Sequence, residues 1–190
     1  MRCITCQALS AKIICKACQE NFLTSSFYKR ELKKDFFVYS FYKFDEVKEL
    51  LNTKYEFYGD KVFNILASLS LKKFSDNFEF ENQVYAIPID DHTRHQFSQT
   101  AILTKYLKSK NIKPIYNKLK ATNIVKYAGK DLKFREKNKR FFRYSGKKDI
   151  QVILVDDLVT TGTTILEAKE VLESNGCEVL FALVISDVSI

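Results

Sequence analysis

The sequence is poor in glycine, in proline and in long apolar runs. Its 190 residues include five glycines and two prolines, which argues against disordered linkers and low-complexity segments. No apolar run approaches the roughly 20 residues that a membrane-spanning helix needs. Met1-Arg2-Cys3 leads directly into a cysteine cluster, not into a signal peptide. We therefore expect a soluble, cytoplasmic protein with room for one α/β domain and a small appendage.

The most informative stretch is residues 152–164, which read Val-Ile-Leu-Val-Asp-Asp-Leu-Val-Thr-Thr-Gly-Thr-Thr. Apolar residues predict a buried strand over 150–155, two carboxylates follow where it ends, and helical spacing predicts a helix over 164–174. The Thr/Gly loop between them presents backbone N–H groups, hydroxyls and a helix N-terminus to one point, an arrangement that favours phosphate. Asp156 and Asp157 repel an anion, so their partners are sugar hydroxyls or a metal ion.

This stretch resembles the 5-phosphoribosyl-1-pyrophosphate (PRPP) motif of type I phosphoribosyltransferases. It is not a Walker loop, because the lysine that follows the glycines there is absent. The competing interpretation is an ordinary Thr-rich turn with two solvated carboxylates. The resemblance implies that Asp156 and Asp157 hold the ribose 2′ and 3′ hydroxyls. The residues that it assigns to the 5′-phosphate are Thr160, Thr161, Gly162, Thr163 and Thr164.

A second motif lies at the N-terminus, where Cys3, Cys6, Cys15 and Cys18 form two Cys-x-x-Cys pairs separated by eight residues. Two such pairs complete a tetrahedral Cys₄ site, and four thiolates leave no open position for catalysis. Disulfides need an oxidising compartment, and a redox Cys-x-x-Cys pair does not explain the duplication. We therefore expect a structural Zn²⁺ in a compact knuckle over residues 1–22.

The positive charge is concentrated in residues 105–148, which hold sixteen Lys/Arg and two acids, a net of +14 within a chain of +8. Seven tyrosines and phenylalanines are interleaved with these cations. Three interpretations stay open: a single-stranded nucleic-acid site, a solvated basic face, and cations that neutralise a pyrophosphate. Residues 118–148 are poorly periodic, and we expect a long mobile loop there. Its candidate DNA contacts are Lys133, Arg135, Lys137, Lys139 and Arg140.

Hydrophobic spacing predicts the remaining elements. Strands alternating with helices imply a mostly parallel sheet with right-handed crossovers, and ligands bind beyond the carboxyl ends of its strands. We divide the chain into a zinc finger (1–22), a helical connecting or hood region (23–80) and a main domain (81–190). The predicted strands cover residues 36–44, 84–89, 112–115 and 178–186, and the predicted helices cover residues 45–52, 61–74 and 99–107.

Short matches outside the phosphate loop extend the resemblance along the chain. The matching residues are Lys54-Tyr55, Gly59-Asp60, Ile87-Pro88-Ile89, Arg94, Phe97, Gln99, Leu132, Arg135, Asn138 and Phe141. Together with the cysteines they resemble the ComF family of bacterial competence proteins. Gln96, Ser98 and Asp90 depart from the family pattern on the pyrophosphate side. The implied fold class is α/β: a type I phosphoribosyltransferase-like, mostly parallel sheet flanked by helices, with a small N-terminal zinc knuckle.

This resemblance implies a cytoplasmic competence protein that binds PRPP with Mg²⁺ and handles incoming single-stranded DNA, with components of the DNA-uptake machinery as partners. Arg94 would contact the pyrophosphate. The alternative is a Mg²⁺-dependent transferase that moves the phosphoribosyl group from PRPP to a nitrogen nucleophile. The departures on the pyrophosphate side, Gln96 among them, make us expect PRPP binding more than turnover.

Overall fold

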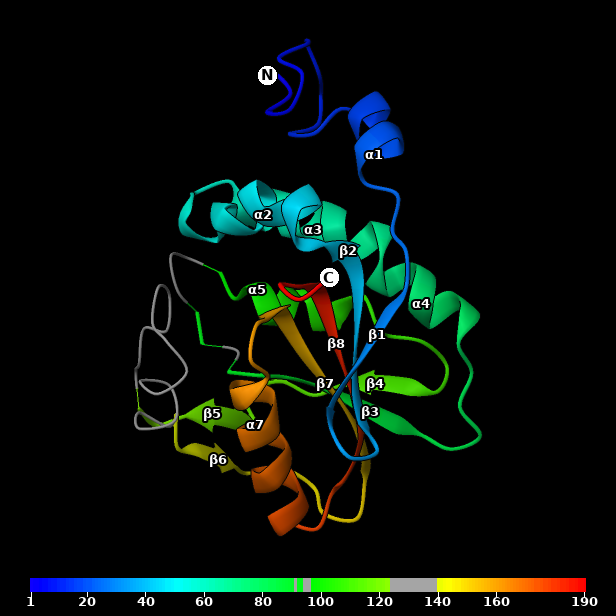
Figure 1. Cartoon of the computed structure of the whole chain (residues 1–190), viewed down its shortest axis with the longest axis vertical. Coiled ribbons are helices and arrows are strands. Elements are labelled where there is room, and N and C mark those ends of the chain that lie inside the picture. Colours follow the sequence, from blue (N-terminus) through cyan, green and yellow to red (C-terminus); the bar gives the residue numbers. More distant parts are fainter. Residues whose placement is uncertain (91, 94–96, 124–139) are drawn as a thin grey trace.

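The computed structural model describes residues 1–90, 92–93, 97–123 and 140–190. Within these ranges, six strands form a central sheet and two form a small antiparallel ribbon (Figure 1). The central strands are β1 (Tyr28–Lys33), β2 (Phe36–Lys43), β3 (Val84–Pro88), β4 (Ile112–Pro114), β7 (Gln151–Val159) and β8 (Glu178–Asp187). The ribbon pairs β5 (Leu119–Ala121) with β6 (Phe142–Tyr144).

The strand order β1-β2-β8-β7-β3-β4 places β7 and β8 at the centre of the sheet. β1 is antiparallel to β2, and the other neighbouring strands are parallel. The expectation of a mostly parallel sheet is therefore confirmed. Strands at the centre of such a sheet are buried on both faces, which is why residues 152–155 read as an unbroken apolar run.

Two groups of helices cover the sheet, and each closes its own apolar cluster. On one side α2 to α5 pack over residues such as Val155 and Leu183. On the other side α7 packs over Val152 and Leu154. The helices are α1 (Lys16–Phe22), α2 (Phe44–Asn52), the 3₁₀ turn η1 (Thr53–Tyr55), α3 (Gly59–Leu69), α4 (Leu71–Asn77), α5 (Gln99–Lys105) and α7 (Thr163–Ser174).

Most predicted elements are present, but some differ from the prediction and one strand was not predicted. The single helix expected over 61–74 is two helices, because the chain breaks at Ser70, whose buried hydroxyl donates to the carbonyl of Leu66 at 2.6 Å. The strand expected to end at residue 155 continues through both aspartates to Val159, where it still pairs with β8. Strand β1 was missed, so the region called helical over 23–80 contributes β1 and β2 to the sheet.

The predicted loop over residues 118–148 is wrong at both of its ends. Leu119 lies opposite Tyr144 and Ala121 lies opposite Phe142 in the β5–β6 ribbon. Leu119 and Phe142 are buried in the cluster beneath α7, and this burial holds the two short strands in place. Strands of three residues carry too little alternation to be recognised from sequence. The middle of the predicted loop, 124–139, lies outside the described residues.

The cysteine-rich segment lies beyond α2, at the end of the molecule away from α7 (Figure 1). It is not a detached appendage, because Cys3, Ile14 and Cys18 are buried in the same cluster as the helices over the sheet. A pocket of about 390 Å³ lies beside this contact; Cys18 lines it from the cysteine-rich segment and Thr53 lines it from η1.

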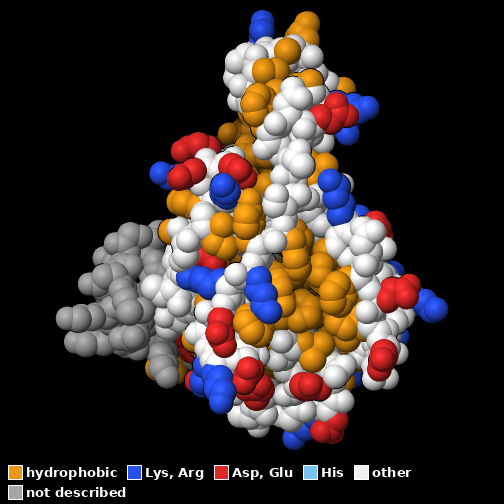
Figure 2. All heavy atoms as spheres, turned by 45° about the vertical axis from the view of Figure 1, so that its right-hand side comes forward, with side chains coloured by type: hydrophobic (Ala, Val, Ile, Leu, Met, Phe, Trp, Pro, Cys, Tyr) orange, Lys and Arg blue, Asp and Glu red, His pale blue; other side chains and the backbone are white. Residues whose placement is uncertain are grey.

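Aromatic rings cover the end of the sheet beside α4. Phe27 stacks on Tyr39 with ring centroids 4.9 Å apart, and Phe74 stacks on Phe78 at 4.8 Å. Phe181 on β8 meets Tyr39 edge to face. Phe27 and Phe78 remain 51% and 42% exposed, and a broad apolar area is visible on this side of the molecule (Figure 2). Across the described ranges, no helix combines the length and the apolarity that crossing a membrane requires.

Candidate functional site

The two predicted carboxylates lie at the end of β7, one strand position apart. Asp157 follows Ile153 and Val155 on the alternating pattern of the strand, and it is 6% exposed. The carboxylate of Asp156 accepts a hydrogen bond from the backbone N–H of Asp157 at 2.8 Å. This hydrogen bond links the two aspartates near the carboxyl end of a central strand. Open α/β sheets bind ligands at the carboxyl ends of their strands.

Lys54 is the counter-ion of this pair. It reaches Asp157 from η1, 103 residues earlier in the chain, with 2.9 Å between Nζ and Oδ2. Burial opposes the ionisation of Asp157, but the charge and the hydrogen bond of Lys54 outweigh it, so the pKa of Asp157 lies below its ordinary value. The pKa of Lys54 is raised, chiefly by the charge of Asp157.

Asp156 behaves differently from its neighbour. Burial, followed by the negative charge of Asp157, raises the pKa of Asp156 well above its ordinary value. Within the pair, Asp157 therefore keeps its negative charge more readily than Asp156 does, and the ammonium of Lys54 balances that charge. Carboxyl oxygens accept hydrogen bonds from hydroxyl groups, so two adjacent carboxyl groups suit the vicinal hydroxyls of a sugar.

The loop after β7 has the features of an anion site. Gly162 takes φ +81°, a left-handed conformation, and precedes the 12-residue helix α7 as its N-cap. No side chain caps α7, and its first turn contains no acidic residue. The first N–H groups of a helix have no partner within it, so those of α7 point toward the loop. The hydroxyls of Thr161 and Thr163 lie 2.9 Å apart beside them.

Arg30, from the edge strand β1, fixes this loop to the sheet. Its guanidinium donates to the carbonyl of Thr160 at 2.8 Å and to the hydroxyl of Ser189 at 2.6 Å. Its Nε lies 2.7 Å from the carboxylate of Asp187, which is fully buried at the end of β8. Sequence reasoning missed Arg30, since nothing in the local pattern links it to a loop 130 residues away.

The described part of the basic segment adjoins the Asp pair. Arg140, predicted as a DNA contact, pairs with Asp90 at 3.2 Å and is 16% exposed. Its charge also acts on Asp156. The backbone N–H groups of Arg140 and Phe141 donate to the carboxylate of Glu167 on α7, so Arg140 is held from two sides. The other predicted contacts, Lys133, Arg135, Lys137 and Lys139, and the predicted pyrophosphate contact Arg94, lie outside the described residues.

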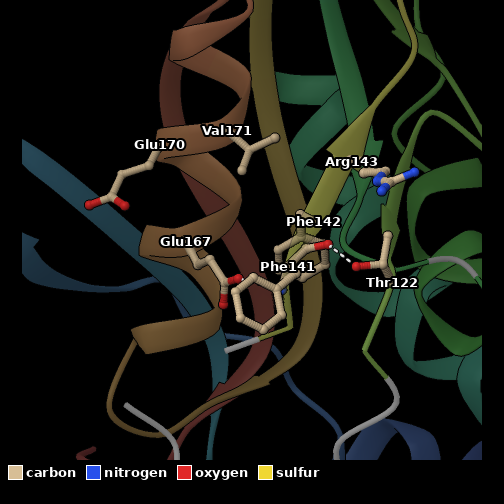
Figure 3. A pocket seen from close by; sticks show the side chains of 7 residues that line it. All are labelled: Thr122, Phe141, Phe142, Arg143, Glu167, Glu170 and Val171. Carbon is tan, nitrogen blue, oxygen red and sulfur yellow. Dashed lines mark hydrogen bonds between the residues drawn. The ribbon is translucent and has the colours of Figure 1, made fainter. Parts of the chain in front are cut away.

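A cavity of about 530 Å³ opens on the flank of α7, against the β5–β6 ribbon (Figure 3). Glu167 and Phe141 line it, and the hydroxyl of Thr122 donates across the ribbon to the carbonyl of Phe141 at 2.7 Å. None of the predicted phosphate or ribose contacts lines this cavity. It is therefore separate from the carboxylate pair and the loop.

The four N-terminal cysteines come together as predicted. Their sulfur atoms all lie within 4.8 Å of one another, and those of Cys6 and Cys15 are 3.7 Å apart. Four sulfurs at about 2.3 Å from a tetrahedral zinc are roughly 3.8 Å apart, so the donor set fits this metal. The N–H of Cys15 donates to the sulfur of Cys3, and such backbone hydrogen bonds lower the pKa of Cys3 to about 6. Thiolate is the form that binds metal.

Comparisons with known proteins bear on the same part of the chain. The model of the phosphoribosyl transferase domain family matches residues 107–189, which run from the end of α5 to the end of β8. No curated protein matches the sequence. The match to the family model covers the Asp pair and the loop after β7 but less than half of the chain.

Three solved structures illustrate the likeness. UMP synthase of Leishmania donovani is 23% identical over 66% of this chain and 22% of its own, with a TM-score of 0.39. A Staphylococcus aureus hypoxanthine phosphoribosyltransferase is 11% identical over 67% of this chain and 64% of its own, with a TM-score of 0.41. Orotate phosphoribosyltransferase from Aeropyrum pernix is 19% identical over 90% of this chain and 80% of its own, with a TM-score of 0.40. The chain thus spans about a fifth of the first and just under two thirds of the second.

The family match and the observed sheet together define the class. The protein has a type I phosphoribosyltransferase-like fold, with a mostly parallel sheet flanked by helices and a four-cysteine cluster at its N-terminus. The expected fold class is confirmed.

Proposed function

We propose that this protein binds PRPP at the end of β7. One observation carries the proposal: the Asp156–Asp157 pair, half-buried at Asp156 and buried at Asp157, is followed within five residues by an uncapped helix N-terminus whose loop turns at Gly162. The Asp pair takes the ribose hydroxyls, and the loop with the first turn of α7 takes the 5′-phosphate. Mg²⁺ enters with the ligand, bound to its phosphate and hydroxyl oxygens.

The biological role that we propose is in natural transformation, as a cytoplasmic protein that handles incoming single-stranded DNA. It is supported by the joined four-cysteine cluster and phosphoribosyltransferase-like domain, and by the sixteen cations of residues 105–148. Those cations neutralise DNA phosphates, and the interleaved rings stack on bases. The N-terminal cysteines hold Zn²⁺ and stabilise the segment that packs on α2.

The alternative function is phosphoribosyl transfer to a nitrogen nucleophile. The family match supports this alternative, since the matched residues include both the Asp pair and the loop after β7. Catalysis would rest on positioning and electrostatics at the Asp pair. Release of pyrophosphate from PRPP in the presence of ammonia or a free nucleobase supports this alternative, and its absence alongside tight binding supports a ligand or regulator role.

The first test is calorimetric titration of Mg²⁺·PRPP into the wild type and into the double variant Asp156→Asn/Asp157→Asn. Asparagine keeps the shape of each side chain but replaces one of its two acceptor oxygens with an NH₂ group. Each variant side chain therefore has one oxygen fewer to accept hydrogen bonds from the ribose hydroxyls. We expect one site per chain in the wild type and at least about tenfold weaker binding in the variant, the equivalent of about 1.4 kcal/mol. Asp76→Asn on α4, at an exposed ion pair, is the matched control. A wild type that does not bind contradicts the proposal.

The DNA role has its own test, in the salt dependence of single-stranded DNA binding. The variant Lys133→Ala/Arg135→Ala/Lys137→Ala should lower the slope of log K against log salt by about 2, since each phosphate contact on a single strand contributes about 0.7. A control with three exposed lysines changed outside residues 105–148, at positions 48, 61 and 73, should keep the wild-type slope. Equal slopes in all three proteins remove the DNA role from this segment.

A further inference from the structure

Lys54 stands at the ligand site but belongs to neither the phosphate loop nor the strand that carries the Asp pair. It lies on η1, between α2 and α3, on the side of the sheet opposite α7. Its ammonium is 2.9 Å from the carboxylate of Asp157, and its side chain is 23% exposed. The groups proposed to hold the 5′-phosphate all come after Val159 in the chain. Lys54 is therefore not one of the groups that bind this phosphate.

Close packing and a backbone hydrogen bond fix the position of η1. A methyl group at Gly59 would lie 2.0 Å from the backbone carbonyl oxygen of Thr53 and 2.8 Å from the ring of Phe97. Glycine at the start of α3 thus lets η1 pack directly against it. The N–H of Glu56 closes the turn onto the carbonyl of Thr53 at 2.8 Å. The chain therefore delivers Lys54 to Asp157 from a rigid turn.

The chemistry of the ligand gives this cation a partner. A hydroxyl oxygen bound by Oδ2 of Asp157, the oxygen that Lys54 contacts, lies at most about 6 Å from the ammonium, since each of the two hydrogen bonds spans about 3 Å. In PRPP the pyrophosphate is attached at C1, next to the C2 hydroxyl. An ammonium has three donors, and one of them goes to Asp157. Arg140 also acts on the pair, but its guanidinium is bound to Asp90.

We propose that Lys54 is a specificity residue that recognises the anionic group at C1, so that the site selects PRPP over ribose 5-phosphate. This inference rests on the proposed PRPP site and adds the residue that distinguishes the activated sugar from its hydrolysis product. A residue that only neutralised Asp157 would support both sugars equally, because both carry the 2′ and 3′ hydroxyls.

The experiment compares the two ligands in three proteins: wild type, Lys54→Met and Lys48→Met. Lys48 is an exposed lysine of α2, so its replacement makes the same charge change close to the site. We expect Lys54→Met to bind Mg²⁺·PRPP about 10- to 100-fold more weakly, the size of one hydrogen bond to a charged group. Its affinity for ribose 5-phosphate should fall by less than about threefold on the same scale. Lys48→Met should match the wild type for both.

Retained binding of ribose 5-phosphate also shows that Lys54→Met is folded. Should that variant not fold, Lys54→Gln provides the same comparison with a polar side chain. Equal losses for both ligands, or no loss for either, overturn the inference and leave the PRPP site standing. A wild type that binds neither sugar overturns the proposed function and this inference with it.

Discussion

The left-handed glycine of the loop after β7 allows a sharp test of the proposed phosphate site, because the chain contains a second glycine of nearly the same conformation. Gly162 has φ +81° and Gly176 has φ +84°. They lie at opposite ends of α7, roughly 20 Å apart at 1.5 Å per helical residue. Alanine in a left-handed conformation costs about 1–2 kcal/mol. Both substitutions should therefore lower the thermal midpoint by roughly 2–8 °C in a protein of this size.

The surroundings of the two positions differ. A methyl group at Gly176 meets nothing closer than 3.7 Å, whereas at Gly162 it lies 2.8 Å from the side chain of Leu32. The end of a leucine side chain can move, so we expect an additional loss of only about 1 kcal/mol at Gly162. The movement occurs between the loop and β1, where Arg30 fixes the carbonyl of Thr160.

The expected result is a separation of stability from binding. Gly162→Ala and Gly176→Ala should both lose stability in thermal or urea unfolding, Gly162→Ala by about 1 kcal/mol more. Only Gly162→Ala should bind Mg²⁺·PRPP at least about tenfold more weakly, or about 1.4 kcal/mol. Calorimetric titration well below the melting temperature of both variants makes the comparison. Wild-type affinity in a folded Gly162→Ala protein, or an equal loss of affinity in Gly176→Ala, would refute the reasoning that this loop holds the phosphate.

Three further predictions concern the hood, the ion pair and the cysteine cluster. Gly59→Ala places a methyl group against the backbone of Thr53, so we expect a loss of about 3 kcal/mol in urea unfolding; a loss below about 1 kcal/mol would mean that η1 shifts freely. The Lys54–Asp157 pair stabilises the fold fully below the ordinary lysine pKa of 10.5, and this stabilisation is lost as pH rises through the raised pKa of Lys54. The difference in thermal midpoint between the wild type and Lys54→Met should accordingly shrink above pH 10.5, and a constant difference up to pH 12 would contradict an ionic contribution. Cys3→Ser should abolish bound zinc measured by elemental analysis, whereas Cys177→Ser, at the buried cysteine outside the cluster, should retain it; unchanged zinc in Cys3→Ser argues against the four-cysteine site.

The parts of the site that are local in sequence were predictable. Asp156, Asp157 and the loop to Thr164 lie within nine consecutive residues, so their order along the chain already places them at the end of one strand. The four cysteines were predictable for the same reason, since the pair spacing defines the geometry of each half-site. These predictions concern groups that any fold with that strand, loop and helix would bring together.

The contacts across the sheet were not predictable in this way. Lys54 was noticed as part of a short family-like match, but its pairing with Asp157 depends on how α2 and α3 cross the sheet. Arg30 lies on a strand that the sequence did not reveal, because alternation in residues 28–33 is masked by charges on the exposed edge. Ser70 broke a predicted helix through one hydroxyl. In each case the contact depends on tertiary packing, and the local sequence pattern does not predict it.

The packing also shows how the cysteine-rich segment is joined to the rest of the fold. Residues 1–22 have too few apolar side chains for a core of their own, and they bury Ile14 and Cys18 against the helices over the sheet. Cys18 and Thr53 line the same pocket between knuckle and hood, and the residue after Thr53 is Lys54. The cysteine cluster and the turn η1, which carries Lys54, therefore lie on two sides of one pocket. A metal held by the four cysteines would order the wall of this pocket that faces η1.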